Sequence, residues 1–315
     1  MSALPQPGPA GWNLEDIVSG LRAARRDWRS QRGRMRQSGG REFPSVEDIR
    51  QVVDELCGAL FPMRLGPADL REETEDAYVQ LTLARALESL RRQIRLELAF
   101  VARSQGGDPA DADRRAADIV NRFAAELPAV RRLLDTDVVA AYQGDPAARS
   151  VDEVLLCYPG VIAMIHHRLA HVLYRLEVPL VARIVAEIAH ADTGIDIHPG
   201  ARIGASFFID HGTGVVIGET TIIGERVRLY QAVTLGAKRF PASENGELKK
   251  GLARHPIIED DVVIYAGATI LGRITVGRAS VIGGNVWLTT SVPPNSQVSQ
   301  ASSIRNCPDD ATGPA

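Results

Sequence analysis

An aliphatic residue occupies every sixth position over a long stretch of this chain. The longest unbroken run comprises Ile258, Ile264, Ile270, Val276, Ile282 and Leu288. A period of six fits neither the 3.6 residues per turn of an α-helix nor the two-residue alternation of an ordinary strand. It is typical of a parallel β-helix built from hexapeptide turns, in which each sixth side chain stacks inside the coil. We therefore predict such a coil over residues 195–295.

The repeat begins upstream and is interrupted twice. The earlier runs are Ile197, Ile203, Ile209 and, after the first interruption, Ile217, Ile223, Leu229, Leu235. The register slips by two residues before Ile217, and the repeat is missing for 23 residues between Leu235 and Ile258. Each interruption contains a histidine, His211 or His255. With three hexads per turn, the repeat predicts a little over four coils, with glycines such as Gly204 and Gly218 at the corners.

The rest of the chain predicts an α+β protein whose helices come first. Residues 1–42 are expected to be a disordered tail and linker containing a short helix near residues 12–28. Residues 43–194 are expected to form a helical domain, with Ser45 as the N-cap of its first helix. Residues 237–255 leave the coil as an excursion loop, and residues 296–315 form a polar tail. Loops on a rigid scaffold are favoured places for binding chemistry.

Composition excludes several classes of protein. A formal net charge of −3 gives no reason to expect nucleic acid or a membrane as a partner. The three cysteines (Cys57, Cys157 and Cys307) are too far apart for a disulfide framework or a metal knuckle. No signal sequence opens the chain, and no apolar run reaches about 18 residues. We expect a cytoplasmic protein, with Cys157 buried and inert in an apolar helical run.

Three of the histidines lie at notable places in the repeat. His198 stands in DIHP at its beginning, His211 in IDHGTG at the register slip, and His255 in ARHP at the end of the excursion loop. Imidazole is the natural general base near neutral pH. A carboxylate that accepts its second N–H fixes the tautomer. Asp196 lies 15 residues before His211, close to one coil of about 18 residues, so the two can face each other on neighbouring coils.

Several segments together resemble the serine O-acetyltransferases of cysteine biosynthesis. They are DIHPGARIG (196–204), DHGTGVVIGET (210–220), VTLGA (233–237), RHP (254–256), AGATILG (266–272) and, among the helices, GDPAARS around Asp145. The resemblance implies a left-handed parallel β-helix that forms trimers, with the acyl-CoA site in the groove between neighbouring subunits. It implies transfer of the acetyl group of acetyl-CoA, a co-substrate, to L-serine, with no permanently bound cofactor and no metal.

The resemblance also implies a role for individual residues. His211 is the expected general base and Asp196 its orienting partner. The residues expected to hold serine are Asp145, Asp210, Arg254 and His255, and those whose backbone contacts the pantetheine arm are Gly236, Ala237 and Ala266. A guanidinium and a carboxylate, as in Arg254 and Asp210, suit a zwitterion. Glycine-lined N–H groups or His255 can serve the oxyanion formed during acyl transfer.

Two features depart from the family pattern. The excursion loop is longer than in the best-known bacterial enzymes. Many members end in an isoleucine that docks into the next enzyme of the pathway, O-acetylserine sulfhydrylase, whereas this chain ends in Ala315, which argues against that partner. The helical half is expected to pair trimers, and the sequence leaves a trimer and a dimer of trimers open.

Three other interpretations remain open at this point. The first is a related transferase whose acceptor is homoserine or a sugar. The second is a γ-type carbonic anhydrase, with zinc held by His198, His211 and His255, although the cationic Arg254 opposes a metal there. The third is a non-catalytic scaffold, against which the placing of two histidines at breaks in the repeat argues.

Overall fold

The computed structural model describes residues 12–31, 43–105, 108–239, 248–249 and 251–300. The chain divides into two compact units, residues 1–42 and 43–315. The described part of the first unit is one helix, α1 (Leu14–Gln31), with no buried residue. The expected disorder of residues 1–11, the linker 32–42, most of the excursion loop (240–247 and 250) and the terminus with Ala315 lie outside the described residues.

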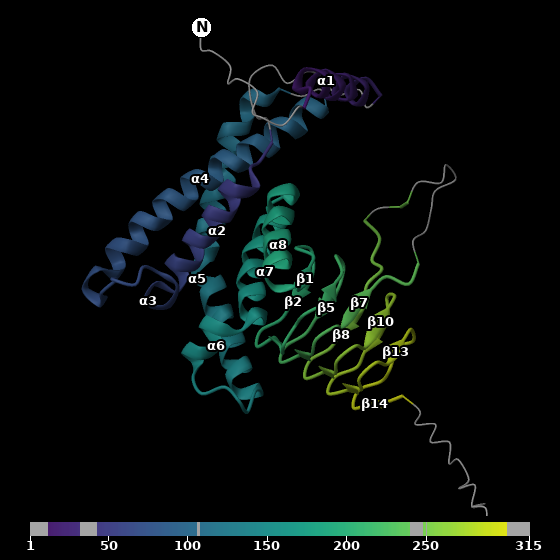
Figure 1. Cartoon of the computed structure of the whole chain (residues 1–315). Helices are drawn as coiled ribbons and strands as arrows, with labels where there is room; N and C mark the ends of the chain where they lie inside the picture. The colour runs from purple at the N-terminus through teal and green to yellow at the C-terminus, as the bar shows by residue number, and fades with distance from the viewer. Residues whose placement is uncertain (1–11, 32–42, 106–107, 240–247, 250, 301–315) are drawn as a thin grey trace, which may run out of the picture. The chain divides into compact units, whose positions relative to one another are not determined.

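The second unit begins with helices (Figure 1). They are α2 (Val46–Leu60), α3 (Pro62–Leu65), α4 (Glu75–Ser104), α5 (Ala112–Gly144), α6 (Val151–Cys157), α7 (Pro159–Arg175) and α8 (Pro179–Thr193), with the short 3-10 turns η1 (Glu72–Thr74) and η2 (Pro109–Asp111). The Ser45 hydroxyl accepts the N–H of Asp48 at 3.3 Å and caps α2, as predicted. Prolines open α7 and α8, where a missing N–H costs no helical bond. None of the described helices is long and apolar enough to cross a bilayer.

Short strands follow from residue 196 onward. They are β1 (Asp196–Ile197), β2 (Arg202–Ile203), β3 (Phe208–Ile209), β4 (Val216–Ile217), β5 (Ile222–Ile223), β6 (Arg228–Leu229), β7 (Thr234–Gly236), β8 (Ile257–Ile258), β9 (Val263–Ile264), β10 (Thr269–Leu271), β11 (Thr275–Val276), β12 (Val281–Ile282), β13 (Trp287–Leu288) and β14 (Gln297–Val298). They form three parallel sheets, ordered β1-β4-β7-β10-β13 (sheet A), β2-β5-β8-β11 (sheet B) and β3-β6-β9-β12-β14 (sheet C). From β1 to β13 the chain visits the three sheets in turn, as in a parallel β-helix (Figure 1).

The hexapeptide prediction is confirmed in the interior of this coil. In sheet A, Ile217 pairs with Ile197 and Leu235, and Leu235 pairs in turn with Ile270. All four side chains are buried. Burial of such aliphatic side chains contributes roughly 1.5–3 kcal/mol each. Sheets B and C have equivalent columns, in which Ile223 pairs with Ile258 and Leu229 with Ile264. One interior residue per sheet in every coil accounts for the six-residue period.

Successive coils differ in length, and the differences fall at the corners. Paired residues are 20 positions apart in the first coil (Arg202 with Ile222) and 18 apart later (Ile257 with Thr275). Across the excursion loop they are 35 apart (Ile222 with Ile257). The expected spacing of about 18 is therefore wrong for the first coil, because its corner DHGTG holds two additional residues.

The helices are joined to the start of the coil by a buried ion pair. The Arg168 guanidinium on α7 contacts both carboxylate oxygens of Asp137 on α5 at 3.0 Å, and both side chains are at most 5% exposed. Arg168 also donates to the carbonyls of Ile203 and Gly204, at 2.5 and 2.7 Å. Asp137 accepts the N–H of Phe207 at 2.9 Å. Burial raises the pKa of Asp137 to about 6 and lowers that of Arg168. The pair fixes α5 and α7 against the turns around β2 and β3.

Candidate active site

His211 lies on the edge of the coil where the chain passes from sheet C to sheet A, here called the C–A edge. It follows β3, and its side chain is 71% exposed. The His211 Nδ1 atom lies 3.8 Å from Oδ1 of Asp210, whose side chain is largely buried. His211 adopts the left-handed conformation, with φ of 58°, which is uncommon outside glycine. Ala232 and Asn285, in later turns of the same edge, share it, so the angle belongs to the corner.

Asp145 comes to the same edge from the end of α5. Its Oδ1 accepts the N–H of Ala147 at 2.8 Å, and its Oδ2 accepts the hydroxyl of Tyr158 at 2.5 Å. These hydrogen bonds, that of Tyr158 first, lower the pKa of Asp145, and the charges of Arg228 and then His211 act in the same direction. The Asp145 carboxylate in turn raises the pKa of Tyr158 to about 12. Asp145 and Asp210 thus place two carboxylates near the accessible imidazole of His211. Tyr158 carried no signal in the sequence.

Asp196, the expected orienting partner of His211, lies beside the end of α8. It lies on β1, and its carboxylate comes within 4.8 Å of donor atoms of Glu187 and His190 on α8. Both Asp196 and His211 are described, and no hydrogen bond or ion pair joins them. Their pairing therefore stays a prediction. Both residues belong to the first, 20-residue coil rather than to neighbouring coils.

Arg254 and His255 lie on a second edge, where the chain passes from sheet A to sheet B (the A–B edge). The Arg254 Nη2 atom donates to Oε2 of Glu219 at 2.7 Å, and the Tyr174 hydroxyl donates to Oε1 of the same carboxylate at 3.1 Å. The ring of His198, one coil away, packs edge-on against Tyr174. The guanidinium is thus held by a partly buried carboxylate and, through Nη1, by the carbonyl of Leu252 at 3.3 Å. The guanidinium has five N–H donors, more than these two acceptors use.

His255 is fixed more firmly than its neighbour. It is 7% exposed, and its Nδ1 atom lies 3.1 Å from the backbone N of Thr220 and 2.9 Å from Oγ1 of Thr220. Burial, followed by the charge of Arg254, lowers the pKa of His255 to about 4, so the ring is neutral at pH 7. A Cβ on Gly218 would lie 2.1 Å from Cδ2 of His255, so only glycine lets the ring pack there.

The backbone groups expected to contact the pantetheine arm fall on both edges. Gly236 ends β7 and pairs with Leu271, and Ala237 follows it at the A–B edge. Ala266 lies in the turn between β9 and β10 at the C–A edge, where its carbonyl accepts the N–H of Asn285. Their positions are compatible with a groove between two copies, and their contact with a substrate stays a prediction.

One chain therefore divides the predicted site residues between two edges. Asp145, Asp210 and His211 gather on the C–A edge, while Arg254 and His255 gather on the A–B edge. Among the residues that the structure describes, no hydrogen bond or ion pair joins a member of one group to a member of the other. A single protomer does not assemble the complete predicted site.

Comparison with known proteins decides the family. "Serine acetyltransferase, plasmid" of Synechococcus elongatus is 55% identical over 293 residues, which cover 92% of this chain and 91% of that protein. The chain belongs to the serine acetyltransferase family. No protein-family model matches it.

Solved structures of serine acetyltransferases share the fold. Serine acetyltransferase 1 of Entamoeba histolytica in complex with L-cysteine superposes with a TM-score of 0.69 at 38% identity, covering 79% of this chain and 86% of that one. The Neisseria gonorrhoeae serine acetyltransferase in complex with serine gives a TM-score of 0.52 at 28% identity, covering 81% and 95%. The helices and the coil of this chain are therefore those of a serine acetyltransferase.

Family membership also decides among the competing interpretations. His198, His211 and His255 do not come together as zinc ligands in the described chain, where the group with donor atoms within 4.8 Å of one another is Glu187, His190 and Asp196. The carbonic anhydrase interpretation and the non-catalytic scaffold are replaced by that of an acetyltransferase. The expectation of a buried Cys157 is wrong, because this last residue of α6 faces solvent.

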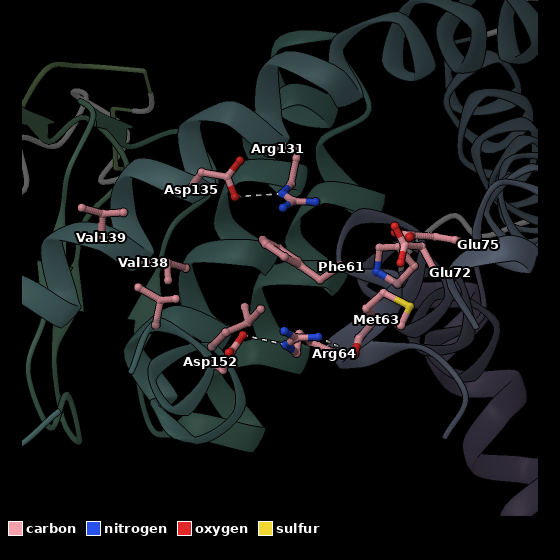
Figure 2. Close-up of a pocket in the computed structure, with 13 residues that line it drawn as sticks. Phe61, Met63, Arg64, Glu72, Glu75, Arg131, Asp135, Val138, Val139 and Asp152 are labelled. Atoms are coloured by element: carbon pink, nitrogen blue, oxygen red, sulfur yellow. Dashed lines mark hydrogen bonds and ion pairs between the residues drawn. The ribbon is translucent and has the colours of Figure 1, made fainter. Parts of the chain in front are cut away.

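A cavity of about 490 Å³ lies among the helices, away from these histidines. Figure 2 shows Phe61 and Val138 in its wall, with the ion pairs Arg131–Asp135 and Arg64–Asp152 beside them. Arg131 also stacks over the ring of Phe61, 4.2 Å from its centre. None of the predicted site residues lines this cavity, so it is separate from the predicted acetyl-transfer site.

Proposed function

We propose that this chain transfers the acetyl group of acetyl-CoA to the hydroxyl of L-serine, giving O-acetylserine for cysteine biosynthesis, with His211 as the general base. The observation that carries the proposal is the grouping of Asp145 and Asp210 beside the exposed imidazole of His211, in a member of the serine acetyltransferase family. Acetyl-CoA acts as a co-substrate, and no permanent cofactor is required.

The charges of the two edges suit an amino-acid acceptor. Asp145 is held ionised by Tyr158 and Ala147, so it can accept hydrogen bonds from an ammonium group together with Asp210. Arg254 can bind the carboxylate. A neutral sugar would leave these charges unpaired, which disfavours it. The family members solved with serine and with L-cysteine support an amino acid as the ligand of this site.

The proposed reaction is a direct attack. His211 removes the proton of the serine hydroxyl while the serine oxygen forms a bond to the thioester carbon. The carbonyl oxygen of the thioester then becomes an oxyanion. When the oxyanion collapses, the carbon–sulfur bond breaks, and the proton on His211 passes to the leaving thiolate of CoA. Removing one hydrogen-bond donor to an oxyanion lowers kcat about 100- to 1,000-fold. The neutral ring of His255 is the proposed donor, and the proximity of both substrates removes any need for an acyl-enzyme.

We further propose that the site is completed by a neighbouring subunit. The division of its residues between the C–A and A–B edges supports a site shared by two subunits. We propose a left-handed coil that forms trimers, in which the C–A edge of one subunit faces the A–B edge of the next. The acyl-CoA would then occupy the groove between them, near Gly236, Ala237 and Ala266. Asp196 is proposed to orient His211 once the groove is formed.

Mixed trimers test this arrangement directly. His211→Ala and His255→Ala subunits, each inactive alone, should regain about a quarter of wild-type turnover when unfolded and refolded together, because about one interface in four then joins two intact halves. No recovery in a verified mixed trimer would contradict a shared site.

The acceptor is tested by measuring CoA release with serine, homoserine and simple sugars. We expect turnover with serine to dominate. We also expect His211→Ala to lose at least about 100-fold in kcat, as for removal of a general base, while still binding acetyl-CoA. Wild-type turnover in that variant would overturn the assignment of His211.

A further inference from the structure

The turn formed by Gly218, Glu219 and Thr220 (the GET turn) makes hydrogen bonds with the segment Arg254–His255. The Thr220 Oγ1 atom accepts the N–H groups of Arg254 at 2.9 Å and His255 at 3.2 Å. A hydroxyl with two accepted bonds has its own proton left to donate, and Nδ1 of His255 lies 2.9 Å away. One side chain therefore uses its full hydrogen-bonding capacity on this segment.

The backbone of the same turn defines the protonation of the ring. The N–H of Thr220 donates to Nδ1 of His255 at 3.1 Å. A nitrogen that accepts an N–H carries no proton, so the proton of the neutral ring must be on Nε2. The described residues form no hydrogen bond with Nε2. The buried polar atoms that lack a partner do not include Nε2 either, so this atom is not sealed inside the fold. Nε2–H is thus a donor with nothing in the described chain to receive it.

Two further contacts fix the segment in place. Arg273 donates from Nη1 to the carbonyl of Thr220 at 2.7 Å and to that of His255 at 3.0 Å. Gly218 leaves the space into which the ring packs. Thr220 carries no charge and is not expected to touch a substrate, so its effect must pass through the two residues that it holds, Arg254 and His255.

We propose that Thr220 is a positioning residue that holds His255 as the Nε2–H tautomer, so that this imidazole acts only as a hydrogen-bond donor to the substrate and never as the base. The inference rests on the proposed acetyl transfer to serine. It assigns the two histidines different chemistry: His211 accepts a proton, whereas His255 donates a hydrogen bond.

The test uses the full chain with ¹⁵N-labelled histidine, comparing wild type, Thr220→Val, which removes the hydroxyl at nearly constant volume, and Thr220→Ser, which restores it. His255→Asn assigns the His255 signals. Long-range ¹H–¹⁵N spectra at pH 7 should show the wild-type ring protonated on Nε2. In Thr220→Val, the Nδ1 signal should move downfield, because one of its two donors is lost. In Thr220→Val the kcat with serine should fall about 10- to 100-fold, with KM for acetyl-CoA unchanged. Thr220→Ser should restore both the kcat and the position of the Nδ1 signal.

A wild-type ring protonated on Nδ1 would overturn the proposal. So would a Thr220→Val enzyme with wild-type kcat and an unmoved Nδ1 signal. A loss of thermal stability alone, with neither readout changed, would show a merely structural role. If Thr220→Val does not fold, the wild-type spectrum and the smaller Thr220→Ala decide in the same way. Failure of the proposed function is distinguishable, since wild type would then release no CoA with serine, whatever tautomer the spectrum shows.

Discussion

The hydroxyl of Tyr158 lies 2.5 Å from Oδ2 of Asp145, at the break between α6 and α7. Pro159 begins α7 and places Tyr158 in an extended conformation between the two helices. The ring is thereby brought back to the end of α5, where Asp145 is located. The break between α6 and α7 thus places a hydrogen-bond donor against the carboxylate that is predicted to bind serine.

We expect Tyr158→Phe to raise KM for serine at least about tenfold, because a hydrogen bond to a charged group contributes roughly 1.5–3 kcal/mol. The KM for acetyl-CoA should not change. Tyr142→Phe, on the exposed side of α5, is the matched control for loss of a hydroxyl. Equal serine KM values in the two variants would show that Tyr158 does not support Asp145.

We expect Gly218→Ala to impair catalysis through a clash that is visible in the geometry. Its Cβ would lie 2.1 Å from the ring of His255, which must move. The kcat with serine should fall by about 100-fold if the ring is an oxyanion donor. The control is Gly20→Ala in α1, where an added Cβ meets nothing within 4 Å. A crystal structure of Gly218→Ala with His255 unmoved would refute this account.

Two ion pairs between α5 and α7 allow a matched test of burial. Asp137→Ala leaves Arg168 buried without its partner and should lower the free energy of unfolding by about 3–5 kcal/mol. Glu126→Ala breaks the exposed pair with Arg175 and should cost at most about 1 kcal/mol. Urea unfolding at pH 7 measures both. Similar costs would mean that the buried pair does not fix these helices to the coil.

The lowered pKa of His255 predicts how stability depends on pH. In the folded chain its pKa is about 4, whereas an unfolded histidine titrates near 6.5. Between these values the unfolded chain binds a proton that the folded chain does not, so this contribution to stability, complete above pH 6.5, is lost as the pH falls toward 4. His255→Asn should therefore reduce the drop in melting temperature between pH 7 and pH 5. His190→Asn, at an exposed imidazole, is the control, and an equal drop in the two variants would count against the shifted pKa.

The repeat predicted the coil because one physical requirement repeats without change. Each sixth residue must fill the interior, and the chain places Ile258, Ile264 and Ile270 there in turn. Such periodicity is readable in a single sequence. The first coil departs from it because its corner holds Gly212 and Gly214, both with positive φ, which allow two more residues before the next strand.

The site was only partly readable from the sequence, for a different reason. His211 and His255 stood out because they lie at breaks in a regular pattern. Tyr158 and Thr220 did not, since their importance arises from hydrogen bonds to residues 13 and 35 positions away. The resemblance to serine acetyltransferases named Asp145 and Asp210, but it could not show that one chain presents them on a different edge from Arg254.

The pairing of Ile222 with Ile257 closes the sheet across 35 residues as neatly as other pairs close it across 18. The pairing of the strands therefore does not depend on the length of the segment between β7 and β8. Insertions and deletions can accumulate in that segment without shifting any strand.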